Sequence, residues 1–462
     1  MVELRLDEIA LRLKGARLQG DPGRLFRTFN FDSRLTQAGE LFFAFVAERD
    51  GHEFVLEAWR QGAGGAVISR EVTVADPSFA LVLVPDTVAA LQSLAAETLR
   101  HQGVKVVGIT GSAGKTTTKE FTAALLGGQF EVLKSSGNYN NHLGLALAVL
   151  GLEEQHQLAV LEMAMRGPGE IRRLTRVAPP DIAVITNINP VHLAFFRSLE
   201  DIAAAKGEIL EGTKADGKAV LNYDDPLVRR VAADWTGEKI FFGLSPECPV
   251  RAERLRPRGF DGLEFTLVVG RDKKKVRIPF FYDSFIYNLL AACGAAFGLG
   301  LSLADILPRL ALLQPFAQRG ALVRLARNIN LLDDSYNSNP FALELALKGA
   351  ARLPAKRKVA VLGDMLELGP REAEFHQEAG RKAARLGYQM LITVGPLAGL
   401  MAEGAIASGL KRKQAYSFDT APEAAEALVP LLRRGDLVLV KGSHGVHLEK
   451  VVAHLKDWIK ET

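Results

Sequence analysis

Short apolar runs alternate along this chain with longer stretches in which apolar residues recur every three or four positions. The runs are typical of buried strands in a parallel sheet, and the periodic stretches are typical of helices. The pattern predicts strands at 41–46, 65–68, 104–109, 158–161, 181–186, 329–333, 358–362, 390–394 and 436–440. It predicts helices between them, such as 88–101, 115–126, 199–210, 341–353 and 371–386. Glycine-punctuated strands near 250–280 predict antiparallel hairpins instead. The whole indicates an α/β protein.

Length and local punctuation indicate three domains. A chain of 462 residues is long enough for two to four. We expect a small α/β domain at 1–82, a central parallel-sheet domain at 83–313 and a C-terminal domain at 314–462. Strands and helices alternate regularly after Pro315, which predicts a Rossmann-like, doubly wound third domain.

Composition excludes several classes of protein. Hydrophobic residues make up 48% and charged residues 24% of the chain, as in ordinary globular proteins. A net charge of +4 gives no strong argument for nucleic-acid binding. Cys248 and Cys293 lie too far apart for a disulfide framework or a metal-binding spacing. The N-terminus lacks a signal-peptide core, and no apolar run approaches the roughly 18 residues of a membrane span. We therefore expect a cytoplasmic protein without membrane insertion.

The most informative motif is the glycine-rich stretch that follows the predicted strand 104–109. Its backbone is expected to cradle phosphates at the start of a helix, while Lys115 reaches the β- and γ-phosphates and Thr116 offers a hydroxyl to Mg²⁺. The common phosphate-loop spacing asks for glycine where Ile109 stands, so this loop is a variant. An ordinary glycine-rich turn is the alternative. The residues expected at the nucleotide are Gly111, Ser112, Ala113, Gly114, Lys115, Thr116 and Thr117.

Three polar residues follow or lie within other predicted elements. Glu162 directly follows the strand 158–161, where a carboxylate could meet nucleotide-bound Mg²⁺. A surface ion-paired glutamate is the alternative. His192 lies in a loop after the strand 181–186, and Lys206 lies in the helical pattern 199–210. Taken alone, a hydrogen-bonding loop histidine and a solvated helix lysine are the simpler interpretations.

The order of these features resembles the Mur ligase family, the ATP-dependent amide-forming ligases of bacterial cell-wall precursor synthesis. The matching features are the loop 110–117, Glu162, His192, the stretch 205–209 and Asp334. Stretches 333–340, 361–369 with His376, and 440–443 are most similar to the family member that adds D-alanyl-D-alanine to UDP-N-acetylmuramoyl tripeptide. Residues 32–34 and 47–52 are similar to its uridine-nucleotide domain, so the resemblance spans about residues 30 to 443.

The resemblance implies a cytoplasmic ATP- and Mg²⁺-dependent ligase of peptidoglycan synthesis that forms an acyl phosphate, with ADP as a product. It implies that the first domain binds the UDP substrate and the central domain binds ATP, and that an open form closes around the intermediate. The implied partners are small molecules, UDP-N-acetylmuramoyl-tripeptide and D-alanyl-D-alanine, with no nucleic acid. We expect the chain to be a monomer.

The resemblance also implies roles for individual residues. The catalytic residues are Lys115, Lys206, His192 and Glu162. Lys206 is expected to be carbamylated and to hold Mg²⁺ together with Thr116, Glu162 and His192. Asn288 is expected at the adenine, and Arg319 and Asp334 at the phosphates and ribose. The residues expected at the other substrates are Ser33, Arg34, Arg49, Asp50, Gly51, His52, Asn138, Asn141 and Asn337.

The chain departs from the family pattern at three places. Ser284 and Phe285 stand where relatives often carry His-Asn, His444 stands where an arginine is typical, and Ser112-Ala113 replaces Thr-Asn. The alternatives are a folylpolyglutamate-synthase-like ligase, which needs no uridine-nucleotide domain, and a P-loop ATPase of non-ligase function. A role for His376 in the site and a purely structural role are both left open.

Overall fold

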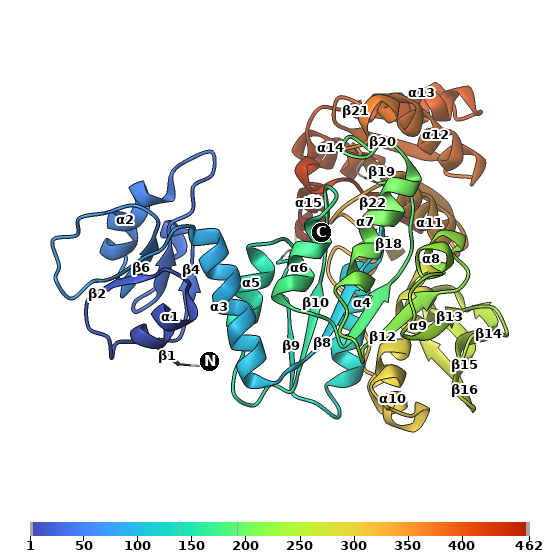
Figure 1. The fold of residues 1–462 in the computed structure, drawn as a ribbon. Helices are drawn as coiled ribbons and strands as arrows, with labels where there is room; N and C mark the ends of the chain where they lie inside the picture. Colours follow the sequence, from blue (N-terminus) through green and yellow to red (C-terminus); the bar gives the residue numbers. More distant parts are fainter. Residues whose placement is uncertain (1–2, 138, 192, 459–462) are drawn as a thin grey trace.

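A five-stranded sheet organises the N-terminal lobe of the molecule (Figure 1). The computed structural model describes residues 3–137, 139–191 and 193–458. In this sheet β2 is antiparallel to β7 and the other strands are parallel. Its order is β2 (Arg17–Gln19), β7 (Ala80–Leu83), β6 (Gly65–Ile68), β5 (Leu41–Phe43) and β4 (Phe29–Asn30). The lobe also contains the ribbon β1 (Leu4–Arg5) and β3 (Leu25–Phe26), and helices α1 (Leu6–Arg12) and α2 (Val55–Arg60).

A nine-stranded sheet forms the centre of the molecule. Its order is β16 (Asp272–Ile278), β15 (Leu263–Val269), β14 (Val250–Pro257), β13 (Glu238–Gly243), β12 (Lys218–Asn222), β11 (Ile182–Ile185), β8 (Lys105–Thr110), β10 (Leu158–Glu162) and β9 (Val132–Lys134). The pairings β14–β15 and β15–β16 are antiparallel and the rest are parallel, which confirms the hairpins predicted near 250–280.

Helices cover both faces of the central sheet. One face carries α3 (Thr87–Gln102), α5 (Gly144–Leu150), α6 (Glu170–Val177), α7 (Leu199–Glu211) and α8 (Pro226–Val231). The other carries α4 (Lys115–Leu126), α9 (Ser284–Gly298) and α10 (Leu303–Leu310). Helix α3 begins at the cap residue Asp86, whose carboxylate accepts bonds from two backbone N–H groups, and it links the N-terminal lobe to the centre.

A six-stranded sheet forms the C-terminal lobe, with order β17 (Ala321–Leu325), β18 (Ile329–Asp333), β22 (Asp436–Lys441), β19 (Arg357–Gly363), β20 (Met390–Val394) and β21 (Ala415–Phe418). Only the β17–β18 pairing is antiparallel. The helices are α11 (Pro340–Ala351), α12 (Glu372–Arg385), α13 (Gly399–Ala407), α14 (Ala421–Leu428) and α15 (Glu449–Trp458). They cover both faces, as expected for a doubly wound sheet. The last strand, β22, lies between the first two parallel strands, which brings the ends of β18 and β22 together.

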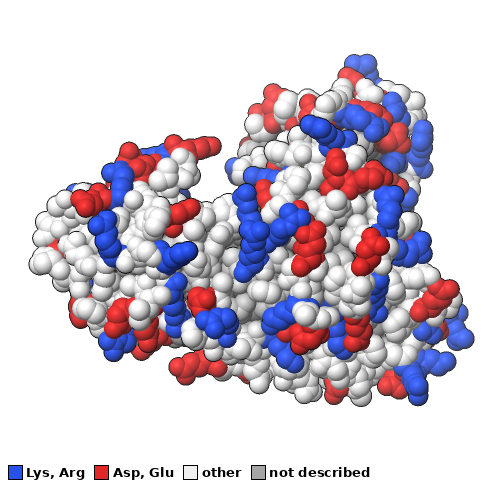
Figure 2. Space-filling view, viewed as in Figure 1, with Lys and Arg blue, Asp and Glu red and all other residues white. Residues whose placement is uncertain are grey.

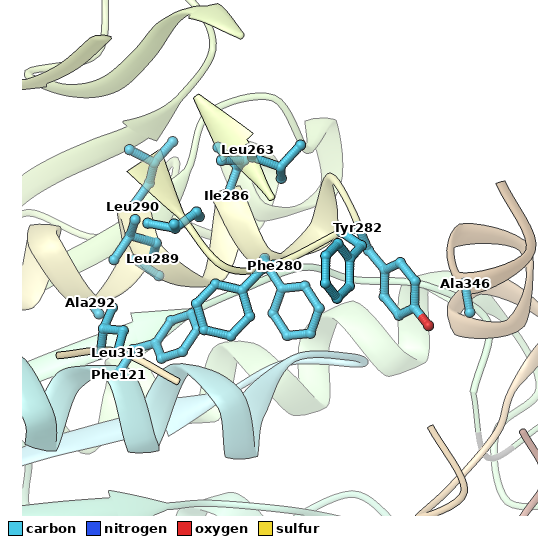
Figure 3. Close-up of a cluster of buried hydrophobic side chains, with 14 of the residues drawn as sticks. Phe121, Leu263, Phe280, Tyr282, Ile286, Leu289, Leu290, Ala292, Leu313 and Ala346 are labelled. Carbon is cyan, nitrogen blue, oxygen red and sulfur yellow. The ribbon is translucent and has the colours of Figure 1, made fainter. Parts of the chain in front are cut away.

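The two faces of the central sheet belong to different hydrophobic cores. Val106 packs in the core shared with the N-terminal lobe, whereas Val107 packs in the core shared with the C-terminal lobe. Successive side chains of a strand point to opposite faces, so the strands from β8 to β13 contribute to both cores. Figure 3 shows part of the second core, where Phe121 and Phe280 lie under α9 and Tyr282 points toward Ala346 of α11.

Charge is distributed without a dominant sign on the face shown in Figure 2, where basic and acidic side chains are interspersed. The same view shows an open hollow between the N-terminal lobe and the C-terminal lobe.

The predicted domain boundaries, after residues 82 and 313, lie at the last residue of β7 and in the link between α10 and β17. We retain these boundaries as a proposal.

Candidate functional site

The glycine-rich loop joins β8 to α4, and two of its glycines have conformations that other residues rarely adopt. Gly111 has φ 150° and Gly114, which caps α4, has φ 81°. A Cβ at Gly111 would lie 1.9 Å from Thr186 Oγ1, and one at Gly114 would lie 2.2 Å from Asn288 Oδ1. Glycine is therefore required at both positions, because any side chain would collide with a residue of the same site.

The segment that follows β11 holds this loop in place. The Ser112 N–H donates to the Asn187 carbonyl and the Ala113 N–H donates to Asn187 Oδ1, both at 2.9 Å. Ser112 Oγ accepts a bond from the Asn189 N–H at 2.8 Å. Sequence reasoning missed Asn187 and Asn189, although their position directly after a predicted strand was a usable signal.

Lys115 and Thr116 start α4 and meet the end of β10. Lys115 Nζ donates to the Gly111 carbonyl at 2.9 Å. Burial lowers the pKa of Lys115, which nearby Glu162 opposes and Arg319 reinforces. The Thr116 hydroxyl donates to Glu162 Oε2 at 2.8 Å, and Asn140 Nδ2 donates to Glu162 Oε1 at 2.9 Å. Both oxygens of the buried Glu162 carboxylate are thus oriented at the loop, and Asn140 is a further contact that the sequence did not reveal.

Two predicted residues reach this site from the C-terminal lobe. Arg319 Nη2 lies 3.2 Å from Thr116 Oγ1, and its guanidinium lies 3.9 Å from the centre of the Tyr336 ring. Asp334 follows β18 and pairs with Lys441 Nζ, at the end of β22, at 2.8 Å. Burial raises the pKa of Asp334, and Lys441 and Arg319 act against that rise. Lys441 also donates to the Asn337 carbonyl at 2.9 Å.

Lys206 is buried in the middle of α7, with 2% of its surface exposed. A capping box between Ser198 and Asp201 starts this helix, and Gly207 allows close packing, since a Cβ there would lie 2.7 Å from Val231. Burial lowers the pKa of Lys206 well below its usual range, and the positive charge of Lys115 adds to the effect. Among the described residues none forms a hydrogen bond or ion pair with its amine.

His192 and Asn138, both predicted to belong to the site, lie outside the described residues. Within residues 3–137, 139–191 and 193–458 there is no cluster of three or more His, Cys, Asp or Glu side chains that could hold a metal ion. The oxygen donors at the loop are the Thr116 hydroxyl and the Glu162 carboxylate.

A pocket of about 600 Å³ opens beside Gly114 between the central and C-terminal sheets. This volume is in the range of small-molecule sites. Of the predicted residues, it is lined by Ala113, Gly114, Thr117, Asn288, Arg319 and Asp334. Tyr287, which donates to Asp224 at 3.0 Å, lies on the same wall. Phe285 also lines it but packs against Phe280 and Tyr282 in the aromatic cluster, which explains why an apolar residue is accepted there.

Among the residues that the structure describes, the polar contacts of the N-terminal candidates lie within their own lobe. The exposed Arg34 pairs with Asp32 at 2.7 Å, and Ser33 Oγ donates to Glu57 at 2.8 Å. The Arg49 guanidinium lies 4.5 Å from the Phe54 ring centre. Gly51 is required, since a Cβ would lie 2.6 Å from the Phe45 carbonyl.

The loop 47–52 is fixed by a buried histidine. His52 Nδ1 lies 2.5 Å from Asp50 Oδ1, and Nε2 accepts the Ser69 N–H at 2.8 Å. Hydrogen bonds from the His52 backbone and ring lower the pKa of Asp50 to about 2, and Arg70 contributes. These contacts orient the loop 47–52 and leave Arg49 at its surface.

Three polar side chains have local structural contacts. Asn141 Oδ1 accepts the Gly144 N–H at 2.8 Å at the start of α5. His376 Nε2 accepts the Met365 N–H at 3.0 Å, and Nδ1 donates to the Glu372 carbonyl at 2.7 Å. A purely structural role for His376 accounts for the hydrogen bonds of both ring nitrogens. His444 is exposed and its ring lies 5.6 Å from that of Tyr336.

Comparisons with known proteins agree with this geometry. Residues 109–296 match the Mur ligase middle domain, and residues 318–444 match the family described as Mur ligase, glutamate ligase domain. The UDP-N-acetylmuramoyl-tripeptide–D-alanyl-D-alanine ligase of Bacillus subtilis is 35% identical over 92% of both chains. That of Escherichia coli is 32% identical over 92% of this chain and 93% of the relative.

Solved structures of Mur ligases are also similar to this chain. MurF from Acinetobacter baumannii has a TM-score of 0.90 and 28% identity over 99% of each chain. MurF ligase from Thermotoga maritima, solved in complex with ADP, has a TM-score of 0.83 and 30% identity, covering 94% of this chain and 98% of that one. A Mycobacterium tuberculosis folylpolyglutamate synthase, at 14% identity and a TM-score of 0.65, shares only the fold.

Proposed function

The chain belongs to the Mur ligase family, and from that premise we propose that it joins D-alanyl-D-alanine to UDP-N-acetylmuramoyl-tripeptide while cleaving ATP to ADP and phosphate. The observation that carries the proposal is the 35% identity to a ligase of this activity over 92% of the chain, combined with a complete phosphate loop. The product is the UDP-pentapeptide of peptidoglycan synthesis.

The reaction begins when the terminal carboxylate of the tripeptide attacks the γ-phosphorus of ATP. The bond to the β–γ bridging oxygen breaks, so ADP leaves and an acyl phosphate forms. The loop N–H groups and Lys115 bind the phosphate oxygens and stabilise the charge of the transferring group. Burial lowers the pKa of Lys115, and negatively charged phosphates act in the opposite direction and favour its protonated form.

The amine of D-alanyl-D-alanine then attacks the acyl carbon. The tetrahedral intermediate expels inorganic phosphate, and loss of the amine proton leaves the amide. Water competes with the amine for the acyl phosphate, so the lobes must exclude it. Arg319 already bonds Thr116 across the two lobes, which supports its assignment to the γ-phosphate side of the site.

Thr116 and Glu162 fit a Mg²⁺ site, because hydroxyl and carboxylate oxygens are the donors that this ion prefers. The ion would neutralise charge on the phosphate oxygens when bound. A second ion would be held by His192 and Lys206 as its carbamate. That modification joins the amine nitrogen to the carbon of CO₂ with release of a proton, and it requires the neutral amine that burial of Lys206 favours.

We assign the remaining predicted site residues to the nucleotide and to the UDP substrate. Asn288 contacts adenine and Asp334 contacts ribose in the 600 Å³ pocket. Ser33, Arg34 and the loop 49–52 bind the uridine nucleotide, and Asn138, Asn141 and Asn337 contact the rest of the substrate. In the described part of the chain, no helix is long and apolar enough to cross a membrane. We also propose a cytoplasmic monomer that binds no nucleic acid.

The test is phosphate release from ATP with UDP-N-acetylmuramoyl-tripeptide and D-alanyl-D-alanine, each omitted in turn. We expect release only when all three are present, together with a UDP-pentapeptide product. ATP turnover that is independent of both co-substrates would contradict the assignment.

A further inference from the structure

A second cavity lies far from the nucleotide pocket, at the opposite edge of the C-terminal sheet. Its volume is about 500 Å³. Its walls include Asn328 and Ile329 at the start of β18, Lys356 just before β19, and Gly435 just before β22. Asp334 and Lys441 lie at the other ends of β18 and β22. Five residues of strand rise about 17 Å, so the two cavities are distinct.

The charged residues that line this cavity are all cations. Arg324 and Lys356 line it, and no Asp or Glu does. Within the described residues, neither cation has an ion pair or a side-chain hydrogen bond. The side-chain amides of Asn328 and Asn330 have no hydrogen bond in the same part of the chain. Arg324, Asn328 and Lys356 are exposed, so the wall offers N–H donors that no protein group engages and two positive charges without a compensating carboxylate.

The apolar part of the lining combines Phe260, from another part of the chain, with Leu325 and Pro354, which lie close to the two cations in the sequence. Phe260 belongs to the turn Gly259–Asp261, which joins β14 to β15 of the central sheet. This turn faces Pro354, since a Cβ at Gly259 would lie 3.5 Å from that ring. Phe260, Leu325 and Pro354 can accommodate the flat or apolar part of a ligand, while the cations face its charged part.

The turn of the neighbouring hairpin brings one polar residue to the cavity. The hairpin between β17 and β18 holds two successive non-glycine residues, Arg327 and Asn328, at φ 56°. Two successive left-handed residues are the geometry that a tight β-hairpin turn requires. Here they place Asn328 on the cavity wall, while the Arg327 guanidinium lies 5.3 Å from the Trp458 ring centre.

We propose that this cavity is a second ligand site, which binds a phosphorylated small molecule with its phosphates between Arg324 and Lys356. Only a polyanion satisfies both cations and the amides at once, and the apolar wall favours one that carries a ring. The site contacts the central hairpin and the C-terminal sheet together, so its ligand holds these two parts of the molecule against each other.

The experiment is calorimetric titration of the full chain with inorganic tripolyphosphate, in a Gly114→Ala background whose Cβ collides with Asn288 and blocks the phosphate loop. We expect one remaining site per chain. Arg324→Gln with Lys356→Gln removes both charges from an exposed wall and is expected to weaken that site at least tenfold, since hydrogen bonds to charged groups are the strong ones.

The matched control is Lys273→Gln with Lys274→Gln, which removes the same charge from exposed positions at the far end of the hairpin. Binding is expected to be unchanged. Asn328→Gly removes an amide and relieves the left-handed strain, so it should weaken binding without lowering thermal stability. The proposal is overturned if the Gly114→Ala chain binds no tripolyphosphate, if the wall variant binds as its parent does, or if the control loses as much.

Discussion

Two lysines of the site, the half-buried Lys115 and the buried Lys206, differ in the chemistry that their surroundings favour. Both have a lowered pKa because desolvation disfavours the charged amine. Lys115 stands in a loop whose N–H groups and glycines suit phosphate, so a bound nucleotide favours its protonated form. The positive charge of Lys115 lowers the pKa of Lys206 further. The surroundings of Lys206 therefore favour its neutral amine, which suits a covalent modification better than an ion pair.

Replacing Lys206 tests whether its amine carries the proposed carbamate. Lys206→Ala is expected to lower kcat at least a hundredfold, because the proposed carbamate is lost, and short carboxylates such as formate should restore part of the rate. Steady-state kinetics with added carboxylate measures the rescue, and a melting curve verifies the fold. A folded variant that no carboxylate rescues would exclude the carbamate.

Asn140 provides a second test at this scale. Asn140→Ala removes the donor to Glu162 Oε1 and is expected to raise the Mg²⁺ concentration for half-maximal activity about tenfold, because the carboxylate loses its orientation. Asn141→Ala is the neighbouring control. It removes the acceptor of the Gly144 N–H at the start of α5 and should cost about 1 kcal/mol of stability, with an unchanged Mg²⁺ dependence. Equal Mg²⁺ dependence in both variants would contradict the assignment of Asn140.

The Asp50–His52 pair predicts a pH dependence. The pKa of Asp50 is lowered to about 2 in the folded chain, so its stabilising contribution is present above the unfolded pKa near 3.9 and disappears as the pH falls toward 2. Asp50→Asn should therefore be less stable than the parent at pH 7, and the difference should shrink from about pH 4 downward. Urea titrations across this range measure it. A difference that stays constant from pH 7 to pH 3 would be evidence against the pairing.

At the scale of elements, local sequence patterns predict single helices and strands, whereas the order of strands in the sheet determines which loops meet. The helix 115–126 and the strands 65–68, 329–333 and 390–394 were predicted with their observed bounds, because each has a strong periodicity of its own. Strands β12 and β13 were missed because their apolar runs are only three residues long, and β17 and β21 were missed because a polar residue interrupts them. The phosphate loop could be predicted because its residues are contiguous. Asn187 and Asn189 carried a signal, their position after a predicted strand, but their contact with the loop, like that of Asn140 with Glu162, depends on the strand order β11-β8-β10.

The strand-to-helix turn at Gly114 gives a prediction about an element boundary. Gly114→Ala is expected to abolish detectable ADP binding, because its Cβ would displace Asn288 and the left-handed conformation is lost. Gly103→Ala is the control. Gly103 also has positive φ, at 63°, but a Cβ there meets nothing within 4 Å, so only about 1 kcal/mol of strain is expected. Calorimetric binding of ADP distinguishes the two, and full binding by the Gly114 variant would exclude the proposed loop geometry.

For the whole molecule, the contact between the central and C-terminal lobes combines good packing with one unsatisfied group. Gly349 of α11 lies against Tyr282, where a Cβ would come within 2.3 Å of the ring. The Tyr282 hydroxyl is buried and has no hydrogen-bond partner within the described ranges. Burial raises the pKa of this tyrosine well above its usual range, so the hydroxyl stays protonated. This single group disfavours the contact that the aromatic cluster favours.

Removing that hydroxyl should stabilise the contact. Tyr282→Phe is expected to raise the melting temperature, because a buried unpaired polar group costs about 1–3 kcal/mol. Tyr388→Phe should do the opposite, since its hydroxyl donates to the Leu347 carbonyl at 3.0 Å. Scanning calorimetry of both variants tests the pair, and a lowered melting temperature for Tyr282→Phe would show that its hydroxyl has a partner in solution.

The two-sided central sheet constrains how such a protein can evolve. Val106 and Val107 are adjacent in the chain, yet one belongs to the core shared with the N-terminal lobe and the other to the core shared with the C-terminal lobe. A recombination event that exchanged any one lobe between diverged genes would leave at least one core with side chains selected in two different lineages. Substitutions in this sheet therefore become established together with partners in both neighbours, and the three parts are inherited as one unit.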